Sequence, residues 1–147
     1  MLFVLRLVIA LIFIVSGFEK LISPSENFLY VLQAYAVFPD VLAGIVAVVF
    51  PWIELVIGLF LALGLWLRPT VLILACMSGS LIMVVIQAII RKLPIDSCGC
   101  FGNLVHLPLH GVIILDVTIF LSAMLFLQNI SAVRRFSLDQ FYDKTSV

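Results

Sequence analysis

The sequence predicts an all-α integral membrane protein, a bundle of four transmembrane helices with a short interfacial helix after the first. The 147 residues are 65% hydrophobic and only 11% charged, and the mean hydropathy is +1.33. This composition excludes a soluble globular domain. Four apolar stretches approach the roughly 20 residues that a helix needs to cross a bilayer. The bundle is expected to form one domain over residues 1–133, followed by a polar tail at 134–147.

The predicted spans carry very few charged residues. Arg6 lies in the first span, Glu54 in the second and Asp116 in the fourth, whereas the third has no charge. Charges inside a bilayer are costly, and by default they indicate a functional site or a buried ion pair. The four spans are expected at about residues 2–17, 41–67, 70–90 and 111–127.

A short amphipathic helix is predicted between the first two spans. Pro24 breaks the chain after the first span, and Ser25 is a typical N-cap residue. Apolar residues then recur at helical spacing up to Pro39, namely Phe28, Val31, Leu32 and Tyr35. Such a helix lies at the membrane interface, either as a simple anchor or as the roof of a lateral pocket.

The distribution of Lys and Arg gives a slight preference for one orientation. More of these residues fall on the side that holds both termini, which favours a cytoplasmic location for the termini. The connection between the third and fourth spans would then face the bacterial periplasm or an equivalent oxidising space. Because the formal net charge is zero, nothing suggests nucleic-acid binding.

That connection contains the pair Cys98 and Cys100, separated only by Gly99. Cysteines this close form a disulfide only if the backbone folds tightly, and glycine supplies that freedom. A bridge so small is expected to be strained, and strained exposed bridges are labile and oxidising. The alternative is two reduced surface cysteines in a turn.

Cys76 is the third cysteine of the chain. It precedes Ile90, the expected end of the third span, by fourteen residues, or about 21 Å of helix. A disulfide requires Cα atoms within about 7 Å, so Cys76 is not expected to pair with Cys98 or Cys100. We interpret Cys76 as a small buried apolar residue, and the reactive pair therefore requires a partner protein.

Three motifs stand out along the chain. Gly17-Phe18-Glu19-Lys20 closes the first span, Pro51-Trp52-Ile53-Glu54 with Gly58 lies within the second, and Cys98-Gly99-Cys100-Phe101-Gly102 precedes the fourth. Together these motifs resemble the MauE/DoxX family of small redox-associated membrane proteins. The similarity covers about residues 1–130. The resemblance implies a four-helix bundle in the bacterial inner membrane that supports disulfide chemistry in exported proteins, beside a thioredoxin-like periplasmic partner.

Relatives of this kind are also linked to quinone chemistry, and the fold resembles the four-helix core of vitamin K epoxide reductases. The resemblance therefore implies quinone as a candidate cofactor, although no cofactor is certain. This chain has Cys-x-Cys in place of the Cys-x-x-Cys of those enzymes, and it lacks a second loop pair of cysteines. We expect a thiol–disulfide relay, with Cys100 as the attacking thiol and Cys98 as the resolving one.

Residues near the pair are candidates for proton transfer or for metal binding. His106 or Asp116 would accept a proton during thiol exchange. Alternatively, Cys98 and Cys100 with His106 and His110 offer two thiols and two imidazoles to copper or zinc. Either histidine is equally compatible with a simple position at the level of the lipid headgroups.

Glu54 needs a partner or a proton at mid-membrane depth. Arg6, from the cytoplasmic end of the bundle, is the first candidate for its partner, and Lys20, from the other end, is the fallback. We favour an ion pair that holds the bundle together, and the alternative is a proton site beside a bound quinone.

A different class of function also fits the chain. Its size and apolar exterior suit a non-catalytic accessory subunit of a larger membrane redox complex. A relay would form a mixed disulfide with its partner, whereas an accessory subunit would not.

Overall fold

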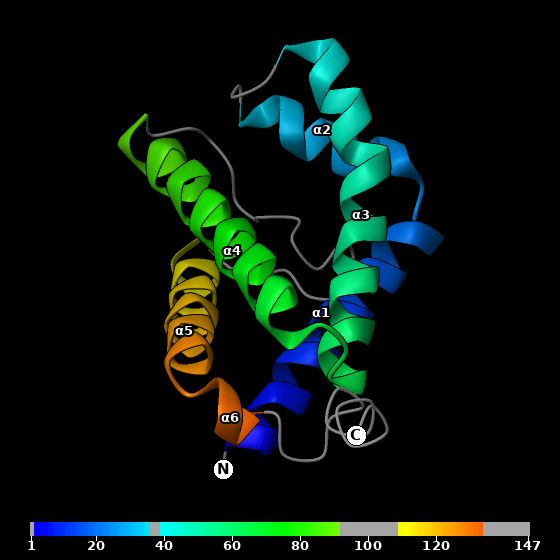
Figure 1. The fold of residues 1–147 in the computed structure, drawn as a ribbon. Coiled ribbons are helices and arrows are strands. Elements are labelled where there is room, and N and C mark those ends of the chain that lie inside the picture. The colour runs from blue at the N-terminus through cyan, green and yellow to red at the C-terminus, as the bar shows by residue number, and fades with distance from the viewer. Residues whose placement is uncertain (1, 36–38, 92–108, 134–147) are drawn as a thin grey trace.

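The computed structural model describes residues 2–35, 39–91 and 109–133 and is entirely helical over these ranges (Figure 1). Four of its helices are long and apolar enough to cross a membrane, which confirms the predicted fold class. The helices are α1 (Leu2–Ile22), α2 (Ser25–Ala34), α3 (Asp40–Leu63), α4 (Leu67–Ile90), α5 (Leu109–Gln128) and α6 (Ile130–Val133).

The helix ends differ most from the predicted spans at two places. Helix α1 continues past Gly17 to Ile22, because the charged residues that end the apolar run are still accommodated within the bundle. Helix α3 ends at Leu63, not at 67, because Gly64 adopts the left-handed conformation (φ 70°) that terminates helices. The predicted interfacial helix is present as α2, but Pro24 is its N-cap and Ser25 is its first residue.

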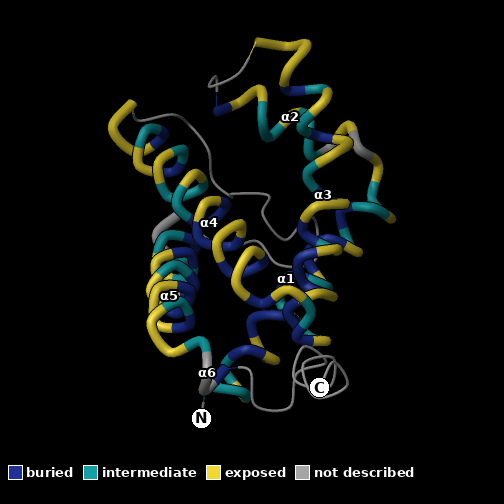
Figure 2. Tube along the Cα trace, viewed as in Figure 1, coloured by how far each residue is buried: buried dark blue, intermediate teal, exposed yellow. Residues whose placement is uncertain are grey.

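The four long helices associate as two close pairs, α1 with α3 and α4 with α5. The main core between them consists of large apolar side chains such as Phe13, Leu61, Leu74 and Phe126. Only a third of each apolar span is buried inside the chain. The remaining faces expose large hydrophobic side chains along the outside of the bundle (Figure 2), as a lipid environment requires.

A second, smaller core lies at the end of the bundle that carries α2. Tyr35, at the end of α2, is buried in one cluster with Val85 and Ala88 of α4 and Val112 of α5. The connection between α4 and α5 leaves the described structure at Arg91 and rejoins it at Leu109, so both of its attachment points are at this end. The opposite end carries α6, which contacts α1.

Candidate functional site

A buried network of hydrogen bonds joins α1 to α3. Lys20 Nζ lies 2.6 Å from Glu54 Oε2 and donates a second hydrogen bond of 2.8 Å to Ser16 Oγ. The Ser16 hydroxyl in turn donates to Glu54 Oε2 over 3.3 Å. Ser16 and Lys20 are one helical turn apart and therefore share a face of α1. The Lys20 and Glu54 side chains are 2% and 6% exposed, so the two charges neutralise each other out of contact with solvent.

Glycine allows the two helices to come close enough for this network. A Cβ atom at Gly17 would lie 2.8 Å from the Leu55 nitrogen and 2.9 Å from the Pro51 carbonyl oxygen, which is too close for any side chain. At Gly58 it would lie 2.9 Å from the Ile14 nitrogen. The motif around Gly17 and Lys20 thus fits directly against the motif around Pro51 and Glu54.

Two aromatic rings complete the surroundings of the Lys20 ammonium group. The nitrogen lies 5.5 Å from the ring centroid of Phe28 and 5.9 Å from that of Phe50. The two rings are 6.0 Å apart and come from α2 and α3. Such cation–π contacts stabilise a desolvated ammonium group. They also place α2 over the ion pair, so that the interfacial helix covers this part of the bundle.

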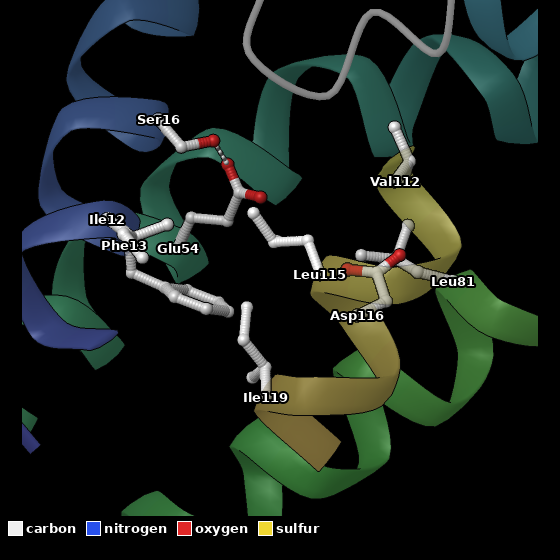
Figure 3. A pocket seen from close by; sticks show the side chains of 9 residues that line it. All are labelled: Ile12, Phe13, Ser16, Glu54, Leu81, Val112, Leu115, Asp116 and Ile119. Carbon is white, nitrogen blue, oxygen red and sulfur yellow. Dashed lines mark hydrogen bonds between the residues drawn. The ribbon is translucent and has the colours of Figure 1, made fainter. Parts of the chain in front are cut away.

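A cavity of about 30 Å³ adjoins the ion pair and is lined by side chains from all four long helices (Figure 3). Glu54 enters it from α3 and Asp116 from α5, and the rest of its lining is apolar except for Ser16. A cavity of this volume has room for about two water molecules. The lining residues are Ile12, Phe13, Ser16, Glu54, Leu81, Val112, Leu115, Asp116 and Ile119.

Asp116 and Tyr35 both hold buried polar atoms whose hydrogen-bonding capacity is unused. Asp116 is 5% exposed, and its Oδ2 has no hydrogen-bond partner among the described residues. Tyr35 is equally buried, and its hydroxyl likewise finds no partner in the described part of the chain. Burial first, and any negative charge on Asp116 second, raise the pKa of the Tyr35 phenol. The two groups are therefore electrostatic neighbours.

Arg6 does not belong to this site. It lies at the opposite end of the bundle, where its Nη1 donates a 2.9 Å hydrogen bond to the Val133 carbonyl oxygen and its guanidinium lies 5.0 Å from the Phe3 ring centroid. Of the two candidate partners for Glu54, the structure thus selects Lys20. Arg6 instead satisfies a carbonyl at the C-terminal end of α6, which is a favourable position for a cation.

The other sequence-predicted residues are not assembled within the described ranges. Cys98, Cys100 and His106 lie outside the described residues, and so does the side chain of His110, which is in the first turn of α5. The proposed copper or zinc set falls in the same region. In the ranges 2–35, 39–91 and 109–133, no group of three or more His, Cys, Asp or Glu is placed to hold a metal ion.

The interpretation of Cys76 as a buried residue is wrong. Its side chain is exposed on the outer face of α4. Helix α4 is apolar on all sides, so its sequence gives little indication of which face turns toward the core. Cys76 still lies fourteen residues before Ile90, the last residue of α4.

Sequence reasoning also missed three members of the site: Ser16, Phe28 and Phe50. Ser16 had a detectable signal, because it precedes Lys20 by four residues and so shares its helix face. The aromatic residues had none, because Phe28 and Phe50 are brought to Lys20 only by the packing of α2 and α3.

Comparisons with known proteins give a consistent result. The family model described as methylamine utilisation protein MauE matches residues 1–129. The methylamine utilization protein MauE of Paracoccus denitrificans is 30% identical over 118 residues, which is 78% of this chain and 61% of that protein. The chain thus spans about three fifths of the length of this curated relative. No solved structure matches.

Proposed function

The chain belongs to the MauE family, and from this premise we propose that it is a membrane-embedded thiol–disulfide relay acting in methylamine utilisation. The observation that carries the proposal is the Cys98-Gly99-Cys100 sequence in the connection between α4 and α5. The two attachment points of this connection are at the end of the bundle where α2, Asp116 and the Lys20–Glu54 pair gather. The connection that contains the pair is thus attached at the end of the bundle that also holds these buried acid–base groups.

The exchange proceeds in two balanced steps. The Cys100 thiolate attacks a disulfide of the partner, forming a mixed disulfide and releasing one partner sulfur as a thiolate that takes up a proton. The Cys98 thiolate then attacks the Cys100 sulfur, which closes a disulfide in this chain and frees the second partner thiol. The reverse sequence transfers a disulfide to the partner.

We propose that the disulfide is exchanged with a second molecule, because the third cysteine of the chain, Cys76, is not placed to serve as the partner. Cys76 lies about 21 Å along the axis of α4 from its end at Ile90 and faces outward. The partner we propose is a thioredoxin-like periplasmic protein or a disulfide-containing exported protein. The connection would then face the periplasm, with both termini in the cytoplasm.

Gel-shift labelling with a water-soluble maleimide in intact membranes tests the relay. In the wild type we expect Cys98 and Cys100 to be blocked until a reductant is added. Cys98→Ser should accumulate a larger, reductant-sensitive band that contains the partner, because the resolving thiol is missing. Cys76→Ser is the matched control and should behave as the wild type.

Two results would contradict the proposal. The first is free labelling of both thiols without reductant and no adduct in either single variant. The second is normal oxidation of the exported partner in the double variant Cys98→Ser/Cys100→Ser. Either result would favour an accessory role in a membrane complex.

A further inference from the structure

The ion pair leaves one buried acid, Asp116, without a cationic partner among the described residues. Three polar side chains line the cavity, Ser16 from α1, Glu54 from α3 and Asp116 from α5. Lys20 binds to Ser16 and Glu54 beside the cavity, and Tyr35 of the α2 side interacts electrostatically with Asp116. Helix α4 contributes only Leu81 to the lining. Lys20 is the single cation of this group and is already engaged with Glu54.

An ionised Asp116 would therefore give the cluster a net negative charge inside the bundle. Asp116 is 5% exposed, lines the cavity and has a free Oδ2 within the described structure. A carboxylate in such a place requires either a cation or a proton. Arg6 is excluded as the cation, because it is bound to the Val133 carbonyl at the other end of the bundle.

The cavity itself favours a proton. Six of its nine lining residues are aliphatic or aromatic, and its volume of about 30 Å³ has room for about two waters. A calcium ion would need more oxygen ligands than Ser16, Glu54 and Asp116 supply, since it takes six to eight. Water in this cavity, by contrast, would have three polar side chains as partners, which is the number that buried water typically uses.

We propose that Asp116 carries a proton and that the cavity is a proton-binding site in the membrane interior, with water linking Asp116 to Glu54. The carboxylic acid gives its proton to a water molecule in the cavity, leaving a carboxylate and a hydronium ion, and the reverse transfer restores the acid and the water, so that the site binds or releases one proton. The Tyr35 hydroxyl, unpaired within the described residues and next to Asp116, is the polar group on the α2 side of the site. This inference goes beyond the proposed thiol exchange and does not depend on it.

Infrared spectroscopy of the full chain in lipid nanodiscs at neutral pH tests the proton. The carbonyl stretch of a protonated carboxyl group is separate from the carboxylate and amide bands, and it shifts in D₂O. We expect this band in the wild type and its loss in Asp116→Asn. Asp40→Asn is the matched control, because Asp40 is exposed at the start of α3, and the band should remain.

Isotope labelling makes the test independent of how the variants fold. In wild-type protein that contains ¹³C-carboxyl aspartate, the band should shift to lower frequency, whereas ¹³C-carboxyl glutamate should leave it in place. Tyr35→Phe should move the band without removing it, because the hydroxyl is a neighbour of the carboxyl group. Three results would each overturn the proposal. The first is absence of the band, and the second is a shift of the band only with labelled glutamate. The third is an ionised Asp116 in a protein whose stability depends on Na⁺ or K⁺.

Discussion

The two helix pairs of the bundle are held together in different ways. Between α1 and α3 the backbones are in contact at Gly17 and Gly58, where an added Cβ would meet main-chain atoms at 2.8–2.9 Å. Between α4 and α5, the nearest atom to a Cβ at Gly79 would be the Phe120 ring at 3.5 Å, an ordinary van der Waals contact. The α1–α3 interface therefore has no space for a side chain at these glycines, whereas α4 and α5 pack through side chains, which can adjust.

This difference coincides with the distribution of polar groups. The close α1–α3 contact brings Lys20 and Ser16 within hydrogen-bond distance of Glu54. The α4–α5 pair contributes one buried acid, Asp116, which faces the other pair across the cavity. Small residues at transmembrane interfaces often serve packing alone. Here they also hold an ion pair in place, so substitutions in the two pairs should have unequal effects.

The largest effect is expected from removing one charge of the ion pair. Glu54→Ala leaves the Lys20 ammonium buried without its counter-ion, and breaking a buried pair in this way costs about 3–5 kcal/mol. Denaturant unfolding in micelles, followed by circular dichroism, measures the loss. The double variant Lys20→Met/Glu54→Leu should recover most of it, because matched apolar side chains often replace a buried pair without cost. A single variant as stable as the wild type would refute a structural role for the pair.

Substitution of the contact glycine should have the next largest effect. Gly17→Ala places a methyl group against the backbone of α3 at Pro51 and Leu55 and forces the helices apart, at a cost of about 1–3 kcal/mol. Gly44→Ala is the matched control on α3, since nothing lies within 4 Å of its added Cβ. That variant should be as stable as the wild type or gain up to about 1 kcal/mol from helix propensity. Equal unfolding midpoints for the two variants would contradict the contact.

The fold was largely predictable from the sequence, for a physical reason. Burial in lipid selects for long apolar runs, and these runs identify the four spans. The Pro24 break and the helical spacing of apolar residues identify the interfacial helix. The end of α1 was harder to predict, because Lys20 ends the apolar run but is buried by its pairing with Glu54. A hydropathy pattern contains no information about the partner of a charge.

The candidate site was predictable only in its residue types. Glu54, Lys20 and Asp116 stand out as charges near apolar spans, but the choice between Lys20 and Arg6 as the partner of Glu54 depends on helix packing. The outward position of Cys76 was missed for the same reason, because a helix that is apolar all round has no distinguishable face. The sequence gives the type of each side chain and its approximate depth in the membrane. It does not show which side chains of other helices lie next to it.

The smallest effect is expected in the second helix pair, at Gly79. Gly79→Ala adds a methyl group that meets only the Phe120 ring, at 3.5 Å and 3.9 Å, and no backbone atom within 4 Å. Because alanine also favours the helix by up to about 1 kcal/mol, the variant should match or slightly exceed the wild type in unfolding midpoint. Combined with Gly17→Ala, its effect should add independently, since the two sites belong to different helix pairs. A loss at Gly79 as large as that at Gly17 would show that α4 and α5 also depend on close backbone contact, and the distinction between the two pairs would be lost.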